Sequence, residues 1–200
     1  MRVVLATANP DKAAEMTAIL RAVDGLELLE RPSDIADVDE TGTTLVENAT
    51  LKAAAVSSAT GLAAVADDTG LFVDALDGAP GIYAARYAGS HATYEQNVAK
   101  LLVALEHVVV PRRAAFRTAV VLVEPDGGEL VALGELRGAI ASVPSGTNGF
   151  GYDSVFLPDD ADGRTLAELE AAEKHALSHR GRALRALAAQ LADRAARDEG

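Results

Sequence analysis

The sequence predicts an α/β protein, and three observations carry that prediction. Short apolar runs at residues 2–6 and 63–66 contain valines and are typical of buried strands. Residues 11–22 and 43–59 instead space their apolar side chains as amphipathic helices do. With 200 residues, of which 49% are hydrophobic, the chain is long enough for one well-packed domain or for two lobes that share one sheet.

Strands and helices alternate along the predicted chain. Stretches rich in Pro, Gly, Ser and Asp separate them, as is usual for loops and turns. Thr93 and Gln96 have the spacing of a capping box, which marks a helix start. The Pro-Asp-Gly-Gly segment at 125–128 joins two apolar stretches as a β-hairpin. In order, we expect strands at 2–6, 26–29, 63–66 and 71–76, a hairpin of 116–123 with 130–136 that continues at 139–143, and helices at 11–22, 43–59, 93–107, 165–171 and 177–194.

The composition excludes several classes of protein. A formal net charge of −12 argues against an extended surface for duplex nucleic acid, although a locally basic pocket could still bind a small polyanion. The chain has no cysteine, so a disulfide framework and a zinc–thiolate site are impossible. Its apolar runs are shorter than the ~20 residues that span a bilayer, and no signal-peptide pattern opens the sequence. We expect a soluble cytoplasmic protein without a nucleic-acid or membrane partner.

Asp67 and Asp68 directly follow the predicted strand at 63–66. Open α/β sheets place their ligands at the carboxyl ends of strands, so these acids are expected to face a crevice. Two adjacent carboxylates repel each other and lose hydration unless a cation or hydrogen-bond donors compensate them. A bound Mg²⁺ would do so. The alternative is a turn over 67–70 whose side chains bond to their own backbone.

A short polar turn, Thr7-Ala8-Asn9-Pro10-Asp11-Lys12, links the first strand to the first helix. The free amides and the dipole of a helix N terminus favour negative charge, so this turn is a candidate anion site. It lacks the glycines of a Walker loop. Pro10 removes one backbone donor and Asp11 adds a negative charge. We therefore expect the Asp11 side chain to turn away and cap the helix.

Lysine is rare in this chain, with four lysines beside 14 arginines. A lysine ammonium is a compact charge on a flexible stem, which suits phosphate oxygens. Lys12, Lys52 and Lys174 fall in the segments of interest and are candidate ligand contacts. Chance placement is the alternative, and for Lys52 so is a solvated position on an exposed helix face.

A glycine-rich loop at 145–153 contains Phe150 and Tyr152. Glycines allow close approach to the backbone, and an aromatic face can stack on a planar ring. Either aromatic residue could equally be a core residue that anchors the loop. The His179-Arg180 pair at the start of the last helix supplies donors, or is a pair of solvated charges.

Taken together, these segments resemble the inosine/xanthosine triphosphate pyrophosphatases, the Ham1-type enzymes that act on noncanonical purine nucleotides. The resemblance covers essentially the whole chain. Thr69 stands where serine is usual and keeps its hydroxyl, and Asn148 stands where glycine is common. The matching segments are residues 7–12, 47–49 with 51–53, 66–71, 78–86, 149–153, and 173–174 with 178–181.

The resemblance implies one domain over residues 1–200, an elongated two-lobed fold around a long mixed β-sheet with the active-site cleft between the lobes, and a homodimer. The implied reaction is hydrolysis of dITP, ITP or XTP to the monophosphate and pyrophosphate, with Mg²⁺ as cofactor. Asp68 would be the catalytic carboxylate and a metal ligand. Asp39, or its neighbour Glu40, would be the second metal ligand.

The resemblance also assigns contacts with a purine nucleoside triphosphate. The lysines at 12 and 52 would bind the triphosphate, and Phe150 would stack on the purine. Hydrogen-bond donors near the C terminus would bind the 6-oxo group of the base, a group that adenine lacks. The implied substrate-binding residues are Thr7, Ala8, Asn9, Pro10, Asp11, Lys12, Lys52, Thr69, Phe150, Gly151, Tyr152, Asp153, Lys174, His179 and Arg180.

Two alternatives to this function remain open. A Maf-type pyrophosphatase would share the phosphate chemistry but act on other bases, and it is not expected to carry Lys174 together with His179 and Arg180. A non-catalytic nucleotide sensor would have no need of Asp68.

Overall fold

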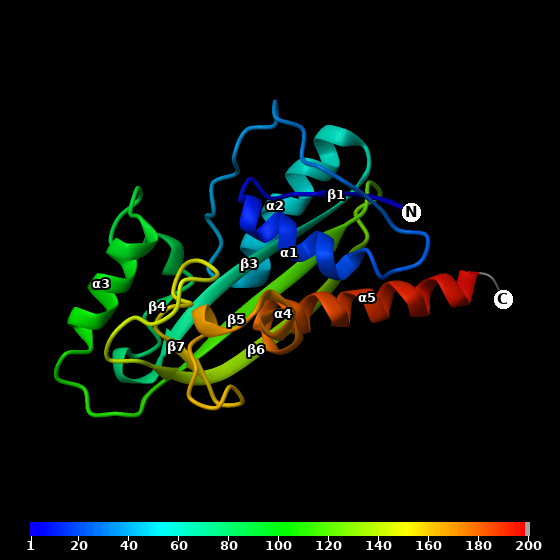
Figure 1. Cartoon of the computed structure of the whole chain (residues 1–200). Helices are drawn as coiled ribbons and strands as arrows, with labels where there is room; N and C mark the ends of the chain where they lie inside the picture. Colours follow the sequence, from blue (N-terminus) through cyan, green and yellow to red (C-terminus); the bar gives the residue numbers. More distant parts are fainter. Residues whose placement is uncertain (199–200) are drawn as a thin grey trace. The chain divides into compact units, whose positions relative to one another are not determined.

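The computed structural model describes residues 1–198 (Figure 1). The chain forms two compact units, each assembled from segments that are far apart in the sequence. The first unit comprises Met1–Asp68, Thr118–Gly134 and the segment from Arg180 onward, and the second comprises Thr69–Arg117 and Glu135–His179. Over the described residues, no helix is long and apolar enough to cross a membrane.

In the described chain, seven strands form one mixed sheet, which confirms the predicted α/β class and its long mixed sheet. In the first unit, β1 pairs in parallel with both β2 and β3. In the second unit, β4 and β7 run antiparallel to their neighbours β3 and β6. The strand order is β2 (Glu27–Leu29), β1 (Arg2–Leu5), β3 (Ala63–Val73), β5 (Arg112–Val123), β6 (Glu129–Ile140) and β7 (Phe156–Pro158), with β4 (Pro80–Gly81) beside β3.

Local capping decides where the main helices begin. The predicted capping box of Thr93 and Gln96 is confirmed, and Thr44 with Glu47 forms a second reciprocal capping box that was not predicted. The expectation that Asp11 caps the first helix is wrong, because Asn9 is the cap. The helices are α1 (Pro10–Leu20), α2 (Leu45–Thr60), α3 (Tyr94–Ala104), α4 (Ala171–Leu177) and α5 (His179–Asp198), with short 3-10 helices η1 (Asp74–Leu76), η2 (Ala84–Arg86) and η3 (Leu166–Glu168).

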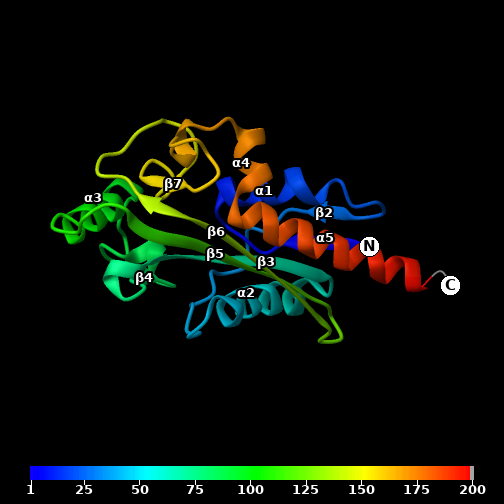
Figure 2. The same ribbon diagram turned by 90° about the horizontal axis from the view of Figure 1, so that it is seen from below.

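The sheet of the first unit is covered by helices on both faces, which Figure 2 shows from below. Along β1, Val3 and Leu5 belong to a buried cluster with residues of α1 and α5, whereas Val4 belongs to a second cluster with residues of α2. Successive side chains of a strand point to opposite faces, so each helix layer receives its own apolar set. This explains the continuous apolar runs, which are typical of strands buried on both faces.

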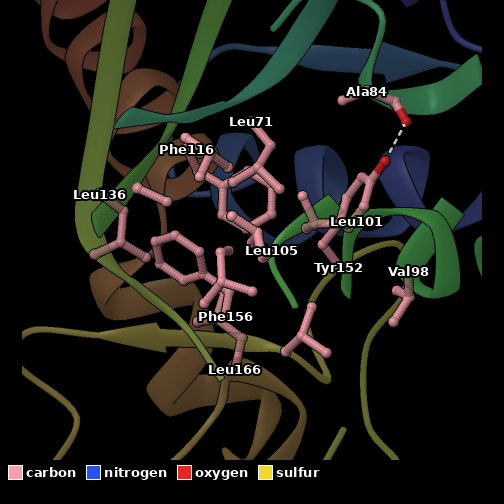
Figure 3. Close-up of a cluster of buried hydrophobic side chains, with 14 of the residues drawn as sticks. Leu71, Ala84, Val98, Leu101, Leu105, Phe116, Leu136, Tyr152, Phe156 and Leu166 are labelled. Carbon is pink, nitrogen blue, oxygen red and sulfur yellow. Dashed lines mark hydrogen bonds between the residues drawn. The ribbon is translucent and has the colours of Figure 1, made fainter. Parts of the chain in front are cut away.

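A separate core fills the second unit (Figure 3). The rings of Phe116 and Phe156 lie 4.7 Å apart between their centroids, and leucines of α3 pack around them. Tyr152 is buried in this core, and its hydroxyl donates a hydrogen bond to the Ala84 carbonyl over 2.9 Å. The aromatic loop residue Tyr152 is therefore an anchor of the core.

The largest departure from the predicted elements concerns β3. The strand does not end at Ala66 but runs on through both acids to Val73, so the strand-end position and the turn over 67–70 are both wrong. Leu71, Phe72 and Val73 favour a strand. Cations on the helices of both faces compensate the charge of the two acids, which lets the strand continue through them. Near the C terminus, the predicted helix at 165–171 is the short η3, and α4 follows it as an unpredicted helix.

Candidate active site

Asp67 and Asp68 are adjacent in sequence but point to opposite faces of β3. Val65 belongs to the apolar cluster shared with α1 and α5, and Ala66 belongs to the cluster shared with α2. The same alternation continues into the acids. Asp67 contacts residues of α1 and α5, whereas Asp68 contacts residues of α2. The strand itself therefore separates the two carboxylates, and each has its own cations.

Asp67 is buried in a cluster of charges on the side of α1 and α5. Arg180 Nε donates to Asp67 Oδ2 over 3.0 Å, and Lys12 Nζ lies 3.2 Å from the same oxygen. Burial acts to raise the pKa of Asp67, but the surrounding cations, led by Lys12, outweigh it and hold the pKa far below its usual value. Asp67 is therefore an ionised anchor of this cluster at neutral pH.

Arg180, a predicted contact of the purine base, is 3% exposed and belongs to this buried cluster. It bonds to Glu15 as well as to Asp67. Burial acts to lower the pKa of Arg180, but the two carboxylates raise it further, so the guanidinium stays charged. For Lys12 the balance is the opposite, since burial outweighs Asp67 and lowers its pKa.

Asp68 lies among polar groups of α2 and of the loop that precedes this helix. Asn48 Nδ2 donates to Asp68 Oδ2 over 3.2 Å, and Lys52 Nζ lies 3.5 Å from Asp68 Oδ1. Lys52 also donates to Glu40 Oε1 over 2.9 Å. Asn48 and Lys52 are four residues apart on α2 and share one face, and the Lys52 ammonium bridges two carboxylates.

The pKa shifts at this second group have a different pattern. Burial, with a contribution from Glu40, raises the pKa of Asp68 in spite of the nearby Lys52. Burial acts to lower the pKa of Lys52, but Asp68 and the other carboxylates outweigh it and raise that pKa. A carboxylate of raised basicity beside a retained ammonium is suited to accept a proton from water.

Asp68 and Glu40 are the side chains that fit a hard divalent cation. Both carboxylates already contact one cation, the Lys52 ammonium, so they lie close enough for a single positive charge to interact with both. Asp39, the other candidate ligand, is exposed. Among the described residues, no three His, Asp or Glu side chains cluster as a metal site. Two carboxylates suit Mg²⁺, which keeps several waters and takes further oxygens from substrate phosphates.

The turn at residues 7–12 is held by its own polar groups. Asn9 Oδ1 accepts the backbone N–H of Asp11 at 2.9 Å and that of Lys12 at 3.3 Å. Thr7 Oγ1 accepts the N–H of Asn9 at 3.2 Å. Ala8, Pro10 and Asp11 are exposed. Two of the free amides at the helix start are thus already bonded to the cap residue Asn9. The Lys12 side chain is the principal cation of the turn.

In the second unit, the predicted contacts Phe150, Asp153 and Lys174 come together. Lys174 Nζ lies 2.8 Å from Asp153 Oδ2 and 4.7 Å from the centroid of the Phe150 ring. Asp153 Oδ2 also accepts the N–H of Phe150 at 2.9 Å. Gly149 has a φ of +76°, and a Cβ there would lie 2.1 Å from the same oxygen. The carboxylate of Asp153 therefore fixes the loop that presents the half-buried Phe150.

The remaining predicted contacts are mostly parts of the framework. His179 is buried and stacks on Phe116, with ring centroids 4.6 Å apart. Tyr152 is the core anchor described above. Gly151 adopts a φ of +65°, and Thr69 is half-buried on β3 directly after Asp68. Asn148 ties the glycine-rich loop to Leu169, whose carbonyl accepts from its side-chain amide at 3.0 Å.

Sequence reasoning missed Glu15. This residue is 7% exposed on α1, three positions after Lys12 and next to the buried Met16. A carboxylate within the core-facing stripe of a helix requires a cation, and that was the available signal. The sequence could not identify the cation, because Arg180 lies 165 residues away along the chain.

Comparison with known proteins decides the family. A family model described as the Ham1 family matches residues 3–190. The chain belongs to the Ham1 family. The dITP/XTP pyrophosphatase of Streptomyces avermitilis is 50% identical to this Ham1 chain over 190 residues, which is 93% of this chain and 94% of that protein. That of Yersinia pestis is 47% identical over 196 residues, covering 96% and 98%.

A solved structure also resembles this Ham1-family chain. A HAM1 protein from Coxiella burnetii shares 41% of its sequence and superposes with a TM-score of 0.88, covering 96% of this chain and 99% of that one. The agreement extends over nearly the full length of both chains.

The buried position of Arg180 makes a testable prediction. Arg180→Ala should lower the free energy of unfolding by about 3–5 kcal/mol, because it leaves two carboxylates buried with one cation fewer. Urea denaturation would measure this loss. The exposed Arg185 on the same helix is the matched control, and Arg185→Ala should change stability by roughly 0.5 kcal/mol or less.

The loss in Arg180→Ala should also depend on pH. Because folding depresses the pKa of Asp67, its stabilisation is present above the unfolded value of about 4 and is lost as the pH falls. The stability difference between wild type and Arg180→Ala should therefore shrink in acid. A difference that is small at pH 7, or that does not change with pH, would contradict the assignment of Arg180 to this ion cluster.

Proposed function

We propose that this Ham1-family protein hydrolyses noncanonical purine nucleoside triphosphates, namely dITP, ITP and XTP, to the monophosphate and pyrophosphate. The arrangement of Asp68, Lys52 and Glu40 carries the proposal, because it combines a basic carboxylate, a cation and a second oxygen ligand. The names of the relatives as dITP/XTP pyrophosphatases support the choice of substrate.

In the proposed reaction, Asp68 accepts a proton from the attacking water. The water oxygen joins the α-phosphorus, and the bond from that phosphorus to the bridging oxygen breaks, so that pyrophosphate leaves. Mg²⁺, when held by Asp68 and Glu40, would neutralise charge on the phosphate oxygens. Asn48 and Lys52 each contact one oxygen of the Asp68 carboxylate and so set its orientation.

The lysines Lys12 and Lys52 would bind the triphosphate. Lys52 is held between two carboxylates and has a raised pKa, so it carries a full charge to a phosphate oxygen. Lys12 stands at the start of α1, where its ammonium adds to the positive end of the helix dipole. With two amides of the turn engaged by Asn9, these ammonium groups supply most of the attraction for phosphate.

Residues of the second unit would bind the purine. Phe150 is half-buried and held by its neighbours, which favours stacking because little side-chain freedom is lost. Lys174 would donate to the 6-oxo group of hypoxanthine or xanthine, whereas adenine presents a donor there. His179, buried against Phe116, would act through the packing of this unit. Arg180 would act through the buried ion cluster of the first unit. The cytoplasmic location and the homodimer remain parts of the same proposal.

A substrate panel with Asp68→Asn tests the reaction. Wild type should release pyrophosphate from ITP, dITP and XTP far faster than from the four common nucleotides, as measured by phosphate release with a coupling pyrophosphatase. Asp68→Asn should lose about 10²- to 10⁴-fold in turnover. Its melting temperature should stay level or rise, because the ionised Asp68 carboxylate is itself destabilising when burial raises its pKa. Preference for a pyrimidine nucleotide would favour a Maf-type activity, and turnover near the wild-type level would remove Asp68 from its role.

The second metal ligand can be decided by a pair of neighbouring variants. Glu40→Gln should raise the Mg²⁺ concentration needed for half-maximal activity by about tenfold or more, because one of two carboxylate ligands is lost. Asp39→Asn should leave this concentration almost unchanged, since Asp39 is exposed and Glu40 contacts the Lys52 bridge. Titration of Mg²⁺ at saturating ITP measures both, and the reverse result would make Asp39 the ligand.

Stacking by Phe150 makes a further prediction. Phe150→Ala should raise the KM for ITP by roughly 10- to 100-fold, since stacking on a base contributes about 1–3 kcal/mol. Tyr152→Phe is the control, because it removes only the buried hydrogen bond to Ala84. That control should lower the melting temperature and leave KM unchanged. Equal effects on KM would mean that the loop as a whole, not the Phe150 ring, binds the base.

A further inference from the structure

We propose that Asn48 is a positioning residue that fixes the Asp68 carboxylate and the segment carrying Glu40 relative to each other. The inference rests on the proposed function, in which these two acids act together. In this role Asn48 sets the distance between the two acids and does not itself contact the substrate.

Both ends of the Asn48 amide are used. Its Oδ1 accepts the backbone N–H of Gly42 at 2.9 Å, and its Nδ2 donates to Asp68 Oδ2 at 3.2 Å. Asn48 is 0% exposed. The reversed amide would place its NH₂ against the N–H of Gly42 and its oxygen against a carboxylate, so only one orientation satisfies both partners. A side chain with one donor end and one acceptor end is required here.

Asn48 is supported by a rigid helix start. It follows Glu47, which occupies position N3 of the helix in the capping box of α2. Glu47 Oε2 accepts from the N–H groups of Thr43 and Thr44 at 2.6 and 3.2 Å. Together, Glu47 and Asn48 therefore bind three successive backbone N–H groups of the incoming loop, and the loop ends in a fixed position on the helix.

Gly42 gives independent evidence for this clamp. A Cβ at position 42 would lie 2.7 Å from Asn48 Oδ1 and 2.7 Å from the Cβ of Glu47. Real Cβ atoms do not approach so closely, so a side chain would force the loop away from the helix. The absence of a side chain at Gly42 is thus what lets the loop reach Asn48.

The clamp determines where Glu40 lies. Glu40 precedes Gly42 by two residues, and Lys52 follows Asn48 by four, which places both lysine and asparagine on one helix face. Asn48 contacts Oδ2 of Asp68, Lys52 lies near Oδ1, and Lys52 bonds to Glu40. Asn48 therefore joins the acid on β3 to the loop acid through one buried amide.

Asn97 provides a matched control within the same chain. It follows Gln96 of the capping box of α3 and is 2% exposed. Its Oδ1 accepts the N–H of Ala88 at 2.7 Å, and its Nδ2 donates to the carbonyl of Ala85 at 3.0 Å. Asn97 thus makes the same kind of helix-to-loop clamp, but its second partner is backbone and no acid is positioned by it.

The test compares Asn48→Asp, Asn48→Ala and Asn97→Asp. Asn48→Asp can still accept from Gly42 but cannot donate to Asp68, so kcat for ITP should fall by about 100-fold while KM stays within about threefold. Asn97→Asp should cost a similar drop in melting temperature without this loss of kcat. Retention of kcat in Asn48→Asp, or an equal loss in Asn97→Asp, would overturn the proposal.

Hydrogen exchange at the Gly42 amide gives a readout that does not depend on activity. Exchange measured by NMR should stay slow in Asn48→Asp and become faster in Asn48→Ala. This measurement remains possible even for a variant whose activity is too low to assay. Unchanged exchange in Asn48→Ala would refute the clamp. If wild type does not hydrolyse ITP while Gly42 exchange responds as expected, the proposed function fails and the clamp stands.

Discussion

The alternation of side chains along β3 is the constraint on which the site depends. Because the strand continues through Asp67 and Asp68, it directs one carboxylate to the side of α1 and α5 and the other to the side of α2. A turn at this point would have let both acids share one environment. The continuous strand instead gives each acid separate partners, so two neighbouring residues of the same type can have different functions.

The two environments shift the pKa values of the two acids in opposite directions. Cations of α1 and α5 overcome burial at Asp67 and lower its pKa, whereas burial prevails at Asp68 and raises its pKa. A buried ion cluster is weak evidence for net stability, since desolvation offsets the attraction between charges. Its clearer consequence is rigidity. With Asp67 held by Lys12 and Arg180, the backbone next to Asp68 is fixed, and a carboxylate that is costly to ionise remains in place.

Features set by nearby residues could be predicted from the sequence, and features set by distant residues could not. The capping box of Thr93 and Gln96 follows from local spacing, and the structure confirms it. The shared face of Asn48 and Lys52 likewise follows from their separation by four residues on α2. The length of β3 does not follow from local sequence, because Asp67 is compensated by a cation far along the chain, Arg180, and Asp68 by Asn48 and Lys52 of α2. The family resemblance supplied candidate residues, but it could not separate Asp39 from Glu40, since one is exposed and the other bonds to Lys52 only in the folded chain.

The same local device stabilises a helix start in both units, and in the proposed reaction it also orients a catalytic group in one of them. Asn48 and Asn97 each follow a capping box, and each uses a buried amide to hold the backbone that leads into its helix. The acceptor for the amide NH₂ differs: for Asn97 it is a backbone carbonyl, and for Asn48 it is the carboxylate of Asp68. A backbone carbonyl makes the clamp purely structural. A carboxylate makes it a means of orienting a reactive group, and it requires no residue beyond those that a stable helix start already provides.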